Sequence, residues 1–314
     1  MKRIVLSTVA LAYLVFSPLA ANRQNEELDV PYVPTPMAVV EEMLRLAEIN
    51  EDDILYDLGC GDGRILITAA VKYGIRGVGV DLDPKRIKES REGARKAGVE
   101  HLVEFHHKNL FETDLHEASI VTLYLLPSVN VKLRTKLLDE VKPGTRVISH
   151  DFSMKEWLED KSIQVGDDEQ IHMVYYWVVP ANVTGVWDVS FNTPLNGSHP
   201  EMFQFEQIFQ FPQGSASIKG SDVILSNVTL TGSRISFSMR FSGQNWDFEG
   251  SASGDVMRGT ARISGNGKTV SWTARRDPET KIPLDPNDLS FDPLTLDDNL
   301  LPRERSGSGK DQVK

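Results

Sequence analysis

The sequence predicts a chain of two parts, a mainly parallel α/β fold followed by a small antiparallel β domain. Short apolar runs and runs of helical periodicity alternate between residues 54 and 150, which is the pattern of parallel strands joined by crossover helices. Beyond residue 181 the helical periodicity stops, Gly, Ser and Asn become frequent, and apolar residues recur at every second position. That change indicates strands with one buried face.

The elements of the first part follow from periodicity and caps. Apolar residues at helical spacing over 39–47, with Thr35 as a cap and Pro36 at the first helical position, predict a helix before the first strand. Strands are then expected at 54–58, 77–80, 102–106, 119–124 and 146–150, and helices at 64–73, 84–97 and 131–140. A long strand at 171–179 is expected to pair antiparallel with one near 162–165. The first domain, residues 22–180, should close there.

The second part, residues 181–276, is expected to form an antiparallel β barrel or sandwich. Alternating apolar residues run along 223–230 and 235–241 and are joined by turn residues. Large aromatic side chains usually fill the core of such a domain, and this role is expected for Trp187, Trp246 and Trp272. Residues 277–314 are rich in Asp, Pro, Ser and Gly and lack apolar periodicity, which predicts a disordered tail.

Residues 1–21 have the pattern of a signal peptide or a short membrane anchor. Lys2 and Arg3 precede an apolar run at 4–16, and small residues follow at 17–21. The apolar run is shorter than the roughly 20 residues that cross a bilayer comfortably. The expectation is therefore an exported or membrane-associated protein, with the cytoplasmic face of the membrane as the alternative location.

Charge and cysteine usage exclude several classes of function. The formal net charge is -11, from 34 Lys and Arg against 45 Asp and Glu, and such a chain lacks the basic surface that nucleic acid requires. Cys60 is the single cysteine, and it lies in a glycine-rich loop without a second Cys or a His at metal-binding spacing. The histidines also show no convincing metal-ligand spacing, so neither a disulfide nor a metal site is expected.

A glycine-rich turn after the first strand carries the main functional signal. In YDLGCGDGR, residues 56–64, Gly59, Gly61 and Gly63 let the backbone approach a ligand and adopt positive φ. Nicotinamide enzymes hold a pyrophosphate with a GxGxxG turn, but here the spacing is GxGxG and the acidic residues Asp57 and Asp62 accompany it. Carboxylates suit a cofactor with sulfonium and ammonium groups better than a dianionic pyrophosphate.

Two polar positions follow the next strands. Asp81 stands at the end of the second strand, where a carboxylate can accept hydrogen bonds from both ribose hydroxyls of an adenosine. The alternative role, capping the next helix, is better filled by Asp83. Residues 108–110 follow the third strand, and a side chain there can meet an adenine amino group.

Together these motifs resemble a class I S-adenosylmethionine-dependent methyltransferase over about half of the chain. PYVPTP at 31–36, DLGCGDGRI at 57–65 and TLYLLP at 122–127 are similar to the lysine methyltransferases that modify ATP synthase c-subunits and adenine nucleotide translocases, and to their prokaryotic relatives. The resemblance implies a Rossmann-like seven-stranded methyltransferase sheet and S-adenosyl-L-methionine as the cofactor.

Carried over by position, the resemblance implies roles for individual residues. The turn with Asp57, Gly59, Gly61 and Gly63 would contact the methionine part of the cofactor, and Asp81 would contact the ribose. Asn109 and Leu110 would contact the adenine, although the family more usually has Asp at the position of Asn109. Tyr32 and Thr35 would fold over the cofactor, or would only belong to a proline-rich spacer. The expected cofactor contacts are Tyr32, Thr35, Asp57, Gly59, Cys60, Gly61, Gly63, Asp81, Leu82, Asn109 and Leu110.

The expected reaction is methyl transfer to a protein lysine amine, with a small-molecule acceptor as the nearest variant. A lysine must react as the neutral amine, which an aromatic pocket of low dielectric favours. Tyr32, Tyr124, His150 and Asp151 are candidates for such a pocket, although the last two could form an ordinary loop start. No Asn-Pro-Pro-Tyr type of signature is present, which disfavours nucleobase and glutamine acceptors. The alternative is an exported binding protein with a β recognition domain and a non-catalytic Rossmann scaffold.

Overall fold

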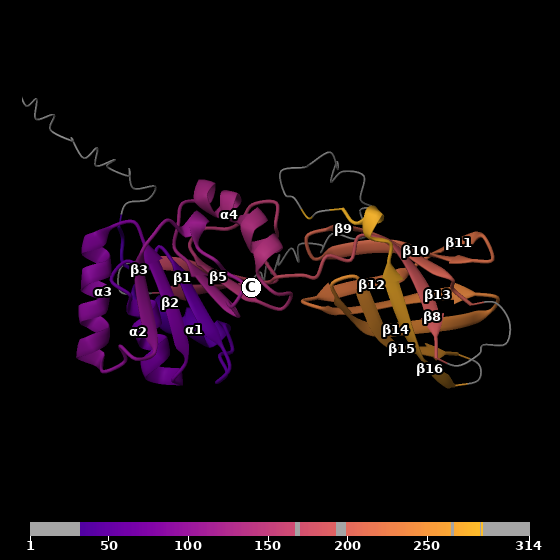
Figure 1. The fold of residues 1–314 in the computed structure, drawn as a ribbon, viewed down its shortest axis with the longest axis horizontal. Helices are drawn as coiled ribbons and strands as arrows, with labels where there is room; N and C mark the ends of the chain where they lie inside the picture. Colours follow the sequence, from indigo (N-terminus) through magenta and orange to yellow (C-terminus); the bar gives the residue numbers. More distant parts are fainter. Residues whose placement is uncertain (1–31, 167–169, 193–198, 265–266, 283, 285–314) are drawn as a thin grey trace, which may run out of the picture.

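The computed structural model describes residues 32–166, 170–192, 199–264, 267–282 and 284. Its two β-sheets lie side by side along the long axis of the molecule (Figure 1). The segment at 1–21, expected to be a signal or anchor, lies outside the described residues. No helix in the described ranges has the length and apolar character that a bilayer span requires.

The first sheet has seven strands in the order β3-β2-β1-β4-β5-β7-β6. All neighbouring pairs from β3 to β5 are parallel, whereas β7 pairs antiparallel with both β5 and β6. This confirms the predicted Rossmann-like sheet and its antiparallel edge. The strands are β1 (Ile54–Leu58), β2 (Arg76–Asp81), β3 (Val103–His107), β4 (Ile120–Leu123), β5 (Arg146–His150), β6 (Lys161–Gly166) and β7 (Ile171–Val178).

Helices cover both faces of this sheet because successive strand residues point to opposite sides. The helices are α1 (Met37–Leu46), α2 (Arg64–Tyr73), α3 (Pro84–Ala97) and α4 (Pro127–Glu140). The first three pack with Leu55 of β1 in one core cluster, while α4 packs with the adjacent Tyr56 and Leu58 in another. The short 3₁₀ helix η1 (Leu110–Glu112) follows β3.

Two helix starts differ from the sequence predictions. Pro36 is the N-cap of α1, so Thr35 does not cap that helix, and its hydroxyl lies against His150 instead. Helix α4 begins at Pro127, four residues before the expected start at Val131. Proline is favoured at a first helical position because the N–H that it lacks would have no partner in the helix there. The prediction relied on apolar periodicity, which begins one turn after Pro127, and therefore placed the start too late.

The second sheet is antiparallel throughout, with nine strands in the order β11-β10-β9-β8-β16-β15-β14-β13-β12. It curls until β10 and β11 approach β12 and β13, so it is a near-barrel and not a sandwich. Its strands are β8 (Gly185–Phe191), β9 (Met202–Ile208), β10 (Phe211–Ile218), β11 (Ser221–Ile224), β12 (Ser226–Thr231), β13 (Arg234–Phe241), β14 (Gln244–Ser253), β15 (Val256–Ile263) and β16 (Lys268–Arg276).

Aromatic side chains fill the interior of the near-barrel. Trp187, Trp246 and Trp272 are buried, as predicted from the sequence. The rings of Phe203 and Phe237 meet edge to face at 5.0 Å, a preferred geometry for aromatic pairs. The second sheet is therefore built around a packed core.

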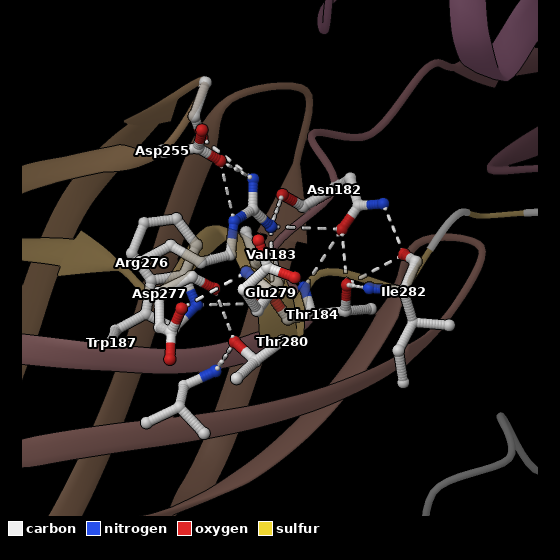
Figure 2. Close-up of polar contacts among 12 residues, drawn as sticks. Asn182, Val183, Thr184, Trp187, Asp255, Arg276, Asp277, Glu279, Thr280 and Ile282 are labelled. Carbon is white, nitrogen blue, oxygen red and sulfur yellow. Dashed lines mark hydrogen bonds and ion pairs between the residues drawn. The ribbon is translucent and has the colours of Figure 1, made fainter.

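A buried arginine holds one end of the near-barrel together (Figure 2). The Arg276 guanidinium donates to the backbone carbonyls of Asn182, Thr184 and Gly254 and pairs with the Asp255 carboxylate at 2.8 Å. It also stacks over the Trp187 ring, 4.6 Å from the ring centroid. Strands β8, β16 and the β14–β15 turn therefore meet at one side chain.

The chain after β16 is ordered for a few residues, which corrects the expectation that a disordered tail begins at residue 277. Residues Pro278–Thr280 form the 3₁₀ helix η2, and the Thr280 hydroxyl accepts a hydrogen bond from the Val186 amide. Further along, the Asn182 side chain donates to the Ile282 carbonyl (Figure 2). The composition of this segment does not predict its order, because that order comes from hydrogen bonds to Val186 and Asn182, far earlier in the chain.

The two sheets share a packed interface. Phe209, in the β9–β10 turn, belongs to the same core cluster as α4 and stacks on Trp157 with ring centroids 5.9 Å apart. Its neighbour Gln210 donates to the Leu158 carbonyl at 2.7 Å. The near-barrel therefore contacts the segment that follows β5.

Candidate functional site

A cavity opens at the carboxyl ends of β1, β2 and β4. In open α/β sheets this edge binds ligands where the strand order reverses, here between β1 and β4. Its empty space, the open mouth included, is about 890 Å³, within the range of small-molecule sites. The lining residues are Tyr32, Val33, Pro34, Thr35, Asp57, Gly59, Cys60, Gly61, Asp62, Arg64, Ile65, Val80, Asp81, Leu82, Asp83, Arg86, Lys108, Leu110, Tyr124 and Leu125.

The glycine turn wraps the end of β2 through backbone hydrogen bonds. The Gly59 and Cys60 amides both donate to the Val80 carbonyl at 2.9 Å, and the Gly61 amide donates to the Asp81 carboxylate at 2.9 Å. At Gly61 φ is +52°, and an added Cβ would lie 2.6 Å from the Tyr32 ring. Only glycine fits this position without strain.

Gly63 has a different role from the other glycines of the turn. It is the N-cap of α2 with φ +77°, and an added Cβ would lie 2.7 Å from the Phe105 ring. It does not line the cavity. Of the three glycines expected at the cofactor, the structure thus brings Gly59 and Gly61 to the cavity and places Gly63 behind them, in the packing between α2 and β3.

Asp81 and Asp83 divide the two roles that sequence reasoning weighed against each other. Asp83 is the N-cap of α3 and accepts a hydrogen bond from the Lys85 amide at 2.8 Å. Asp81 accepts from the Gly61 amide and, with its other oxygen, from the Asp83 amide at 2.8 Å. Asp81 therefore fixes the glycine turn while its carboxylate faces the cavity.

Asp57 is buried at the floor of the cavity. The Thr122 hydroxyl, on β4, donates to its carboxylate at 2.8 Å. Burial raises the pKa of Asp57 to about 7; the hydrogen bond from Thr122 opposes this shift, and the charges of Asp81 and Asp62 add to it. A cationic group in the cavity would stabilise the ionised form of this carboxyl group.

The N-terminal segment before α1 folds over the turn. The Arg86 guanidinium lies over the Tyr32 ring, 4.1 Å from the centroid. Arg64 pairs with Asp62 at 2.6 Å and donates to the Thr35 carbonyl at 2.9 Å. Tyr32 and Thr35 therefore line the cavity, and these contacts make the segment more than a spacer.

The predicted adenine contacts are only partly brought together. Leu82, Leu110 and Lys108 line the cavity, but Asn109 does not. The Asn109 side-chain oxygen accepts a hydrogen bond from the Phe111 amide at 2.9 Å and so caps η1. Sequence reasoning could have weighed this role, because Asn is among the strongest N-cap residues. It also did not single out Arg86 and Leu125, which line the cavity.

The four candidates for the acceptor pocket separate into two pairs. Tyr32 and Tyr124 line the cavity, whereas His150 and Asp151 do not. His150 is fully buried behind Tyr124, with ring centroids 3.9 Å apart. Burial, followed by the charge of Asp151, raises the pKa of Tyr124. Burial and the charge of Asp62 raise the pKa of Tyr32.

Comparisons with known proteins agree with this geometry. Residues 57–161 match the family model described as the ANTKMT methyltransferase domain. The chain is 47% identical to a protein-lysine N-methyltransferase of Saccharolobus islandicus, over 48% of this chain and 94% of that one. It is 32% identical to the lysine N-methyltransferase of the ATP synthase c-subunit from Xenopus laevis, over 51% of this chain and 70% of that one.

Among solved structures, an RNA methyltransferase from Salinibacter ruber in complex with S-adenosyl-L-homocysteine is 53% identical, over 46% of this chain and 93% of that one, with a TM-score of 0.44. The two lysine methyltransferase matches confirm the resemblance inferred from the motifs, because they cover most of each relative. The chain therefore belongs to the protein-lysine N-methyltransferase family that these relatives represent.

Proposed function

We propose that this protein transfers a methyl group from S-adenosyl-L-methionine to the side-chain amine of a lysine in a protein acceptor. The observation that carries the proposal is the cavity at the β1/β4 reversal, walled by the Gly61 turn, Asp57, Asp81 and two tyrosines. Two relatives are named lysine methyltransferases, which supports the choice of acceptor.

The cavity fits the cofactor in shape and in charge. Gly61 lines the cavity and carries no side chain, so a ligand can approach the main chain there. The Asp81 carboxylate, held by two amide donors, retains acceptor capacity for ribose hydroxyls. Asp57 supplies a buried carboxyl group, and a cationic ligand would stabilise its ionised form. When bound, the cofactor supplies an electrophilic methyl group on a sulfonium.

The residues around the cavity then act by orientation and by exclusion of water. The raised pKa values of Tyr32 and Tyr124 keep both phenols protonated near neutral pH, so neither serves as a general base. Their rings instead lower the local dielectric, which lowers the pKa of an entering ammonium. The Gly61 turn, Asp57 and Asp81 would hold the cofactor, which would supply its methyl carbon to the lysine nitrogen once the ammonium proton has passed to solvent. Alignment of those atoms is the main catalytic requirement.

A protein acceptor is favoured over RNA by charge. The net charge of -11 repels a polyanion and attracts a basic or neutral surface. The alternative of an exported binding protein with a non-catalytic scaffold is not favoured, since the Gly61–Asp81 contact and the buried Asp57 are intact.

The experiment that tests the proposal uses radiolabelled S-adenosylmethionine with the full-length protein. Protein extract and total RNA from cells lacking the gene serve as acceptors in separate reactions. We expect label in protein, with mass spectrometry locating methyl groups on lysine. Gly61→Val is the inactive control. Label in RNA alone, or label equal to that of the control, would refute a protein lysine acceptor.

The pH dependence of cofactor binding should follow Asp57. Its folded pKa of about 7 lies above the unfolded value, so this group favours folding at low pH, and its contribution is lost as pH rises from about 4 to about 7. Cofactor binding has the opposite sign, because a cationic ligand favours the ionised carboxylate. Affinity should therefore fall about eightfold between pH 7.5 and pH 6, the change in the ionised fraction of a group with this pKa.

Calorimetric titration at both pH values checks this expectation. Asp57→Asn is the matched variant, since it keeps the size of the side chain and removes its titration. The variant should bind more weakly at pH 7.5 with a flatter profile. An identical pH profile in the variant would assign the dependence to the ligand or to another group.

We also propose, from the sequence of residues 1–21, that the protein is attached to a membrane or exported through that segment. A membrane-attached acceptor would account for an intact cofactor site in such a protein. Cell fractionation with an antibody to the near-barrel tests it: recovery of the full-length chain solely in the soluble cytoplasm contradicts both attachment and export.

A further inference from the structure

Three side chains converge behind the cavity wall, and no part of the proposed methyl transfer accounts for their arrangement. The His150 Nε2 atom lies 2.9 Å from His172 Nδ1, His172 Nδ1 lies 3.0 Å from Asp151 Oδ2, and His150 Nε2 lies 3.3 Å from the same carboxylate oxygen. His150 ends β5, and His172 lies on the adjacent antiparallel strand β7, where His150 pairs with Val174. The pairing brings together residues that are 22 positions apart.

The atoms of these side chains that face away from the convergence each have a partner. His150 Nδ1 lies 3.2 Å from the Thr35 hydroxyl, and His172 Nε2 lies 3.1 Å from the Gln170 side-chain amide. Asp151 Oδ1 accepts a hydrogen bond from the Met173 amide at 2.9 Å. Metal-binding histidines and carboxylates are oriented by outer partners of this kind.

We propose that His150 Nε2, His172 Nδ1 and Asp151 Oδ2 form a binding site for a divalent transition-metal ion such as Zn²⁺. Such an ion lies about 2.0–2.2 Å from nitrogen and oxygen ligands. Ligand atoms at that radius are about 3.0 Å apart at right angles and about 3.4 Å apart in a tetrahedron. The three observed separations, 2.9, 3.0 and 3.3 Å, are close to these values. Two imidazoles and a carboxylate are a ligand set that zinc and iron share.

Hydrogen bonding alone accounts less well for the three-way contact. With both imidazoles neutral, a single proton between the two facing nitrogens leaves a lone pair on one of them facing the Asp151 carboxylate. A proton on each nitrogen instead places two N–H donors only 2.9 Å apart. An ion interacts favourably with all three atoms at once. The imidazole side chains are 0% and 2% exposed and the carboxylate is 27% exposed, so an ion could enter from the side of Asp151.

A second cluster provides the contrast. Asp114, His116 and Glu140 also have their ligand atoms within 4.8 Å of one another, but Lys136 already pairs with Glu140 at 2.6 Å. His116 and Asp114 are 69% and 78% exposed and pair with each other at 2.6 Å. Existing pairs therefore account for this cluster, which serves as the control.

An ion at the proposed site would hold one wall of the cavity. It would fix His150, against which the Tyr124 ring packs at 3.9 Å and whose second ring nitrogen contacts Thr35. Both Tyr124 and Thr35 line the cavity. The three ligands would thus be positioning residues, linking the β5–β7 edge to the site of the chemistry.

The test uses the full-length protein without a histidine tag, stripped with chelator and titrated with Zn²⁺ alone. We expect one ion per chain, an increase in Tm on addition of zinc, and visible absorption bands when Co²⁺ replaces zinc. In His172→Ala and Asp151→Asn, affinity should fall about 100-fold or more, because a direct ligand is lost. His116→Ala should bind as the unchanged protein does.

Asp151→Asn keeps the size of the side chain, so it decides the matter if His172→Ala fails to fold, as judged by circular dichroism. The absence of saturable zinc binding, or binding that survives in the folded variants, would overturn the proposal. Neither cofactor nor acceptor is present in this experiment, so its outcome does not depend on the proposed methyl transfer.

Discussion

Replacing Gly61 with valine is expected to reduce affinity for S-adenosylmethionine about 100-fold or more while the protein still folds. The residue has φ +52°, and a Cβ would lie 2.6 Å from the Tyr32 ring. A branched side chain must therefore displace Tyr32 or the turn itself, at a cost of about 3 kcal/mol for overpacking at a positive-φ position. The backbone amide that binds Asp81 would move with the turn. Calorimetric titration measures the loss directly.

Gly74→Val is the matched control for this experiment. Gly74 also has a positive φ, +68°, but an added Cβ there meets no atom within 4 Å. The control therefore carries the backbone strain without the clash, and it should bind the cofactor normally with a somewhat lower Tm. Equal affinity in both variants would show that the Gly61 turn does not contact the cofactor.

Replacing Arg276 with methionine is expected to destabilise the near-barrel by about 3 kcal/mol. Methionine fills much of the same volume beside Trp187 but leaves the carbonyls of Asn182, Thr184 and Gly254 without their donor. The contact to the Thr184 carbonyl is buried, and a buried acceptor left unsatisfied costs about 1–3 kcal/mol. The part-buried contacts to Asn182 and Gly254 add less, because water can reach those carbonyls. Asp255 is 49% exposed, so solvent screens the ion pair and its loss adds little. Urea unfolding followed by tryptophan fluorescence measures the change.

Arg275→Met controls for the loss of charge. Arg275 precedes Arg276 on β16 and is exposed, so this variant should change the free energy of unfolding by less than about 0.5 kcal/mol. A similar loss in the two variants would mean that net charge, and not the buried network of Figure 2, is responsible.

Expectations based on neighbouring residues along the chain agreed well with the structure. The glycine turn after β1, the carboxylate ending β2 and the cap at Asp83 are features of consecutive residues. The alternation of strand and helix patterns up to residue 150 and the loss of helical periodicity beyond residue 181 located both sheets. The predicted start of α4 was four residues late, because Pro127 begins the helix before its apolar periodicity starts.

Expectations that depended on distant partners were incomplete. Asn109 could be placed after β3, but whether its side chain faced a ligand or its own backbone depended on the η1 turn. His150 could be placed at the end of β5, yet its burial behind Tyr124 depends on how β4 and β5 pack. The ordered segment at residues 277–282 is held by Asn182, Thr184 and Val186, nearly 100 residues earlier.

By itself, then, the sequence determined the order of elements, the Rossmann-like sheet, the antiparallel domain and the acidic glycine turn, because periodicity, caps and turn chemistry act over a few residues. Only the tertiary structure decided that Tyr32 packs on Gly61, that Phe209 joins the two sheets, and that His172 meets His150 and Asp151. Those contacts join residues far apart in the chain. Strand pairing and side-chain packing create them, and neither leaves a local pattern in the sequence.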